Sequence, residues 1–175
     1  MRNVSNAEKA VLMKMYPEGC RVELEYMGPD PCGKLECGDL GTVISIDDAG
    51  QVHILWDKGG SLALAYKVDR CKCLMAKEQM QESLMEIKGM SFTGIVQMME
   101  WIEDKFLPVF PNMLMRPPLN NELIVELGNG AFKFNMPRIS VGFTQNAKGK
   151  VSVKECSMRE GKVIGRASRI RGESL

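Results

Sequence analysis

Residues 41–46, Gly41-Thr42-Val43-Ile44-Ser45-Ile46, and residues 51–56, Gln51-Val52-His53-Ile54-Leu55-Trp56, are both rich in β-branched and aromatic side chains. Such runs are typical of β-strands. The residues between them, Asp47-Asp48-Ala49-Gly50, end in glycine and have the length of a hairpin connection. Residues 41–56 therefore predict an antiparallel hairpin.

Segments on both sides of this hairpin extend the prediction. Residues 21–26 alternate apolar with acidic side chains, and residues 61–66 follow a glycine-rich turn, so each range predicts a further strand. Ser5-Asn6-Ala7-Glu8 has the form of a capping box and predicts a short helix ahead of the strands. Several short strands joined by tight turns indicate a small curled antiparallel barrel.

The hydrophobic period changes after Cys73. Apolar residues recur at helical spacing over residues 76–88 and 93–106, and Pro108 ends the second helix. Alternating segments then return over residues 122–127, 131–136, 138–144, 150–157 and, more weakly, 162–167. The predicted class is α+β, with a helix and small barrel over residues 1–73 and a helical pair followed by an antiparallel meander over residues 74–175.

Composition excludes several classes of function. The 23 Lys and Arg residues nearly balance the 22 Asp and Glu residues, so no global field marks a nucleic-acid or membrane-surface protein. His53 is the one histidine, which excludes a Ser-His-Asp triad and multi-histidine metal sites. No phosphate-binding loop, dinucleotide fingerprint or nucleophile elbow occurs, so we expect a protein that is not an enzyme. We interpret His53 as an outward strand residue rather than a lone general base.

Neither a membrane span nor a signal-peptide core is evident in the sequence, so we expect a soluble cytoplasmic protein with no membrane partner. Cysteines in such a compartment stay reduced, so free thiols are the favoured interpretation of the six cysteines. The alternative is a structural zinc site formed by Cys32, Cys37, Cys71 and Cys73, if the barrel brings the two pairs together. Their spacing is only weakly typical of zinc ligands, and no other cofactor is expected.

Charge is unevenly distributed along the chain. The segment near the C-terminus contains eight cationic residues and three acidic ones, which gives it a local net charge of +5. The eight cations are candidate nucleic-acid or partner-binding residues: Lys148, Lys150, Lys154, Arg159, Lys162, Arg166, Arg169 and Arg171. They suit contacts to phosphates through counterion release, but a solvated strand face with a basic tail explains them equally well. The predicted helices are acidic, and their methionines are also compatible with a homo-oligomeric contact.

Five blocks of the first half resemble a known family: residues 16–24, 41–43, 47–53, 56–64 and 68–70. They are similar to a small domain family of undefined function, common in phage and mobile-element proteins of Firmicutes, that looks like an SH3-type barrel. The resemblance covers about residues 16–73, supplies no catalytic residues and does not extend to residues 74–175.

The resemblance implies an accessory protein of a phage or mobile element. Together with the charge separation, it predicts a non-catalytic protein that acts by binding. The most concrete version is a counter-defence inhibitor, of the anti-CRISPR or anti-restriction type, of a host nuclease or its nucleic-acid complex. The alternative is a direct DNA- or RNA-binding module that uses the basic C-terminal sheet and tail.

Overall fold

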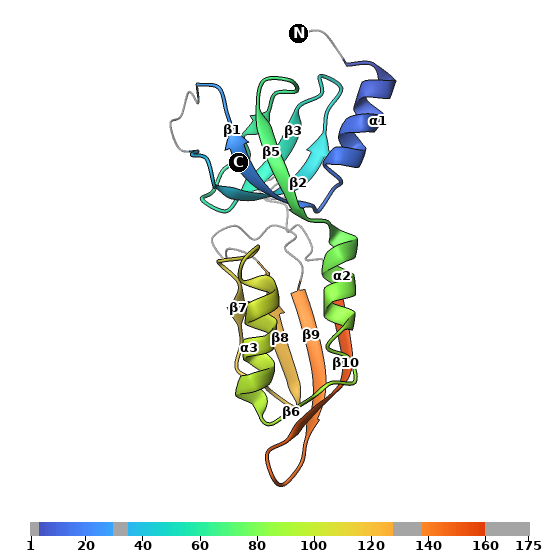
Figure 1. Ribbon diagram of the computed structural model, residues 1–175, viewed down its shortest axis with the longest axis vertical. Helices are drawn as coiled ribbons and strands as arrows, with labels where there is room; N and C mark the ends of the chain where they lie inside the picture. The colour runs from blue at the N-terminus through green and yellow to red at the C-terminus, as the bar shows by residue number, and fades with distance from the viewer. Residues whose placement is uncertain (1–3, 30–34, 128–137, 160–175) are drawn as a thin grey trace, which may run out of the picture.

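The computed structural model describes residues 4–29, 35–127 and 138–159. These residues form three helices and two antiparallel five-stranded sheets, which confirms the predicted α+β class. Figure 1 shows one sheet with α1 at one end of the molecule and the second sheet with α2 and α3 at the other. The elements are α1 (Asn6–Met15), β1 (Arg21–Tyr26), β2 (Leu40–Ile46), β3 (Val52–Trp56), β4 (Ala63–Leu64), β5 (Arg70–Met75), α2 (Lys77–Met85), β6 (Ser91–Phe92), α3 (Ile95–Phe106), β7 (Leu114–Met115), β8 (Glu122–Glu126), β9 (Arg138–Gln145) and β10 (Val151–Arg159).

The N-terminal helix begins where the sequence predicts. The Ser5 side chain accepts a hydrogen bond from the Glu8 backbone N–H, and the Glu8 carboxylate accepts one from the Ser5 backbone N–H. This reciprocal pair satisfies two backbone donors that a helix start otherwise leaves open. Leu12 is the buried residue of α1 and holds the helix against the first sheet.

The first sheet has the order β4-β3-β2-β1-β5 and curls into a half-barrel. The predicted hairpin is confirmed, since β2 and β3 pair from Gly41 opposite Trp56 to Ile46 opposite Val52. Alternate residues of these strands point inward, and Val43, Trp56 and Leu64 are buried in the half-barrel core. The buried side chains of this core all lie between residues 20 and 71 of the sequence.

Two strands of this sheet differ from the prediction. The strand predicted over residues 61–66 is reduced to Ala63–Leu64, because the backbone turns at Ala65, whose N–H donates to the Asp69 carboxylate and whose carbonyl accepts from Val68 and Asp69. The unpredicted β5 follows this turn and pairs with β1, so it becomes an edge of the half-barrel. The alternation of Cys71 and Cys73 with charged residues was the sequence signal for it.

The second sheet has the order β6-β10-β9-β8-β7. Both α2 and α3 lie in front of it in Figure 1, on one face. The buried side chains of that face include Val125 and Val141, which pack with Met80 of α2 and Ile102 of α3. The short edge strands β6 and β7 were not predicted, and the strands predicted over residues 131–136 and 162–167 lie outside the described residues.

A buried arginine joins the half-barrel to the chain that follows α3. Arg21 has no solvent exposure, and its guanidinium forms two hydrogen bonds to the Asp57 carboxylate at 2.9 and 2.6 Å. Its Nη1 donates to Thr42 Oγ1 at 2.9 Å, and its Nε donates to the Val109 carbonyl at 2.8 Å. The same guanidinium lies 4.6 Å from the centre of the Phe110 ring. We call α2, α3, the second sheet and the chain between them the second unit. The Arg21 side chain therefore links the first sheet to the second unit.

Candidate functional site

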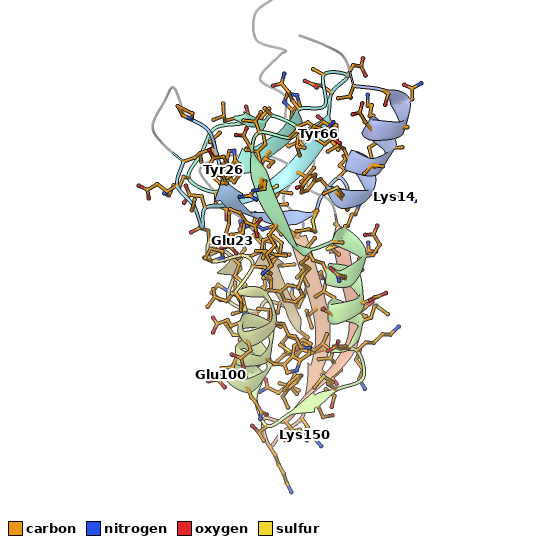
Figure 2. The ribbon with its side chains drawn as sticks, turned by 45° about the horizontal axis from the view of Figure 1, so that its top comes forward. Lys14, Glu23, Tyr26, Tyr66, Glu100 and Lys150 are labelled. Atoms are coloured by element: carbon orange, nitrogen blue, oxygen red, sulfur yellow. A yellow bond between two sulfur atoms is a disulfide. The ribbon has the colours of Figure 1, made fainter. Side chains whose placement is uncertain are left out.

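We call the eight predicted cations the basic strip. The four that the structure describes are spread along β10 and the turn before it rather than gathered in one place. Lys148 and Lys150 lie in the turn before β10, at the end of the molecule far from the half-barrel, as the label of Lys150 in Figure 2 shows. Arg159 is the last residue of β10, about 30 Å from Lys150 at the usual rise of a strand. Lys154 lies between them, where the register with β9 shifts. Lys162, Arg166, Arg169 and Arg171 lie outside the described residues.

The structure groups other arginines around the end of this strip. Arg138 is directly opposite Arg159 in the β9–β10 ladder. Glu126 of β8 is directly opposite Arg138, and its Oε1 accepts hydrogen bonds from Arg138 at 2.7 Å and from Arg116 at 2.9 Å. We call Arg116, Arg138 and Arg159 the arginine triad. No motif in the sequence predicts the triad, because its members come from a proline-rich loop and two strands, and only the pairing of the strands brings them together.

The triad lies on the sheet face opposite the helices. Ile139 and Val141 point into the helix-covered core, so the alternating residues Arg138 and Ser140 point away from it. Among the described residues, no helix covers this second face. We call it the open face.

Exposed acidic side chains also gather on the two helices that cover the other face. On α2 and just after it, Glu78, Glu82 and Glu86 are exposed at intervals of four residues, a spacing that aligns them along one side of a helix. On α3, Glu100, Glu103 and Asp104 are exposed. Lys105 of α3 contacts Glu86 at 2.7 Å and joins the two helices. We call these six carboxylates the acidic helical face.

The cysteine predictions need correction. Cys20 and Cys73 form a disulfide, with their Cα atoms 6.5 Å apart, so the expectation of free thiols is wrong for this pair. Pairing of Val22 with Cys73 in the β1–β5 ladder brings the two cysteines together. The proposed zinc ligand set therefore lacks Cys73. Of its other members, Cys37 is an exposed free thiol, Cys71 is a buried free thiol and Cys32 lies outside the described residues.

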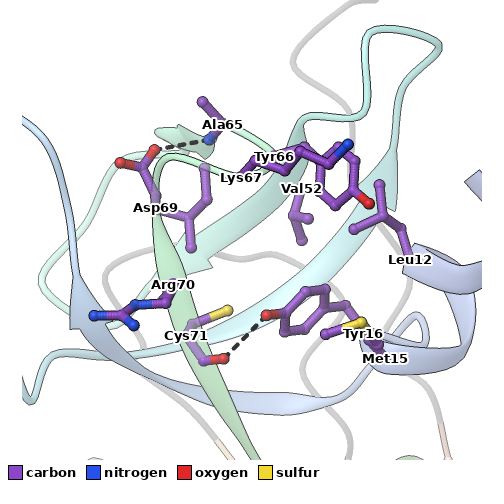
Figure 3. A pocket seen from close by; sticks show the side chains of 11 residues that line it. Leu12, Met15, Tyr16, Val52, Ala65, Tyr66, Lys67, Asp69, Arg70 and Cys71 are labelled. Atoms are coloured by element: carbon purple, nitrogen blue, oxygen red, sulfur yellow. Dashed lines mark hydrogen bonds between the residues drawn. The ribbon is translucent and has the colours of Figure 1, made fainter. Parts of the chain in front are cut away.

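Cys71 lines a pocket at the mouth of the half-barrel, between the C-terminal end of α1, β3, β4 and β5. The pocket has a volume of about 170 Å³. Figure 3 shows the Tyr16 hydroxyl beside β5, where it donates to the Cys71 carbonyl at 3.1 Å. Burial raises the pKa of the Cys71 thiol from 9.0 to about 11 and that of Tyr16 from 10.0 to about 12. Both groups are therefore neutral at pH 7 and are not suited to act as nucleophile or base.

His53 contacts Asp47, a residue of the turn between β2 and β3. Its Nε2 lies 3.1 Å from Asp47 Oδ2, and its side chain is 38% exposed. The same Asp47 carboxylate accepts from the backbone N–H groups of Gln51 and Ala49, and these bonds, led by the one from Gln51, lower the pKa of Asp47. Asp47 is thus a turn residue, as aspartates at hairpin connections usually are.

Within the described ranges, no group of three or more His, Cys, Asp or Glu side chains is arranged to hold a metal ion. The longest helix among them is the 12-residue α3, and none of the described helices combines the length and apolarity that crossing a bilayer requires.

One comparison with known proteins gives a match. Residues 5–74 match the model of a domain of unknown function, DUF4314. The matched range comprises α1, β1 to β4 and all of β5 except its last residue, whereas the acidic helical face and the arginine triad lie beyond it. No curated protein and no solved structure matches the chain significantly.

Proposed function

We propose that the protein is a cytoplasmic, non-catalytic accessory protein of a phage or mobile element, and that it binds and inhibits a host defence nuclease or its nucleoprotein complex. The half-barrel would be an SH3-like scaffold. The second unit would present the binding surface.

The observation that carries this proposal is the set of exposed carboxylates on the two helices of the second unit. The exposed carboxylates of the acidic helical face are carried by α2 and α3, while the triad lies on the opposite side of the sheet. A nuclease holds its substrate in a groove lined by Lys and Arg. Carboxylates at four-residue intervals recur about every 6 Å along a helix, so they present the groove with a row of negative charges.

A cleavage assay tests the proposal. Purified protein is titrated into a reaction between a restriction or CRISPR nuclease of the host and labelled DNA. We expect inhibition by the wild type, and inhibition weakened by about tenfold in the variant E78Q/E82Q, because two carboxylates that face the groove are lost. Neither residue forms an ion pair among the described residues, so the fold should tolerate the change.

The matched control is E18Q/E25Q, which removes the same charge from two exposed positions of the half-barrel. It should inhibit as the wild type does. Equal weakening in both variants would mean that net charge, not the acidic helical face, determines inhibition. Absence of inhibition by the wild type for every nuclease of the host would overturn the proposal.

A second candidate function is direct binding of DNA or RNA. The arginine triad favours it, because guanidinium groups match phosphate geometry and the triad outnumbers the single carboxylate that it contacts. In this version, Lys148, Lys150 and the other cations of the basic strip would add non-specific attraction.

A further inference from the structure

We propose that the arginine triad on the open face is a binding site for the phosphate backbone of nucleic acid. The inference deepens the second candidate function and rests on it. It assigns the contact to Arg116, Arg138 and Arg159, of which only Arg159 belongs to the basic strip.

The contacts of Glu126 position two of the three guanidinium groups. One oxygen of Glu126 accepts from Nη2 of both Arg116 and Arg138, so their side chains converge from β9 and from the loop after β7. The side chains of Arg116 and Arg138 remain 59% and 54% exposed, whereas Glu126 is 27% exposed. Each guanidinium carries five N–H donors, and the contact with Glu126 uses one nitrogen of each. The remaining donors belong to side chains that are more than half exposed, so a phosphate can accept them in pairs.

The triad also has an excess of positive charge that the fold does not require. Arg138 and Arg159 are directly opposite each other on neighbouring strands, an arrangement that destabilises a sheet. Among the described residues, Arg159 forms no ion pair, and Glu126 neutralises only one of the three cations. A phosphate anion between the arginines would replace this repulsion with attraction.

The neighbouring residues of the open face define what kind of nucleic acid fits. The next row away from the triad is Ile124, Ser140 and Ser157, and the following row is Glu122, Gly142 and Glu155. The acidic row lies about 14 Å from the triad at the usual strand rise, so it limits the phosphate contact to the half-barrel end of the face. Among the described residues of these two rows none is aromatic, so they offer no ring on which a base could stack. The site should therefore bind the backbone without regard to sequence.

Fluorescence anisotropy with a labelled DNA duplex and the full-length chain tests the site. The variant R138Q/R159Q removes two cations of the triad, and the matched control K148Q/K150Q removes two cations from the far end of β10. We expect R138Q/R159Q to weaken binding by about tenfold or more and to reduce the slope of log K against log salt by about 2, since each phosphate contact contributes about 0.9. We expect a clearly smaller effect from K148Q/K150Q.

A second measurement separates a binding role from a structural one. If the triad exists to bind phosphate, R159Q removes a repulsion and leaves the urea midpoint unchanged or raises it, while binding weakens. A fall in the midpoint of R159Q would show that Arg159 stabilises the fold and would overturn the charge argument.

The outcomes also separate failure of the site from failure of the function. Equal weakening by R138Q/R159Q and K148Q/K150Q would overturn the triad in favour of the whole basic strip. Duplex binding that R138Q/R159Q leaves unchanged would overturn the triad but retain nucleic-acid binding. A wild-type protein that binds no duplex even at low salt would overturn both.

Discussion

Among single residues, Arg21 is a buried side chain that joins the two units. It is fully buried, it pairs with Asp57, and it donates to the carbonyl of Val109 beyond α3. A buried charge is tolerated only when its partners satisfy it, and removing one partner leaves the other uncompensated. The sequence showed Arg21 only as the first residue of a strand, because neither Asp57 nor Val109 is near it along the chain.

We therefore predict that R21A lowers the free energy of unfolding by about 3 kcal/mol or more, since Asp57 then keeps a charge without its guanidinium partner. Urea denaturation measures the change. The comparison is K9A, which breaks the exposed ion pair between Lys9 and Asp48 and should cost at most about 1 kcal/mol. Similar losses in the two variants would contradict the role assigned to Arg21.

At the scale of elements, the strands with strong alternation were predictable and the short edge strands were not. The β2–β3 hairpin, β9 and β10 follow the apolar pattern of their residues. In contrast, β6 and β7 have two residues each, too few for a periodic pattern. They form because their backbones pair with β10 and β8, respectively. The Cys20–Cys73 disulfide was also missed, because the pairing of β1 with β5 that creates it depended on the unpredicted β5.

The disulfide ties the segment before β1 to β5 across 53 residues of sequence, so it restricts the unfolded chain. We predict that a thiol reductant lowers the free energy of unfolding by about 2–4 kcal/mol. The variant C20S/C73S should show the urea midpoint of the reduced wild type, whether or not reductant is present. The control C37S, which removes an exposed free thiol, should behave as the wild type does. A reductant that leaves the wild-type midpoint unchanged would argue against the bond.

At the scale of the whole molecule, the sequence predicted which segments are charged but not how the charges are arranged in space. The sequence predicts that the helices are acidic. In the structure their acidic side chains are exposed, and both helices lie on one side of the second sheet. The basic strip was defined by nearness in sequence, so it joined Lys148 to Arg159 although a full strand separates them. The sequence does not single out Arg116 and Arg138, because the contact of Arg138 with Glu126 requires the β8–β9 register and that of Arg116 requires the pairing of β7 with β8.

We propose that the protein acts by binding a protein partner through its acidic helical face. The most direct test is an affinity capture from host lysate that contains the defence nucleases, with and without digestion of nucleic acid, followed by mass spectrometry. We predict that a named defence nuclease remains bound to the wild type after digestion, is lost with E78Q/E82Q and is retained by E18Q/E25Q. Recovery of nucleic acid alone, with no nuclease left after digestion, would contradict the claim and favour the arginine triad as the functional surface.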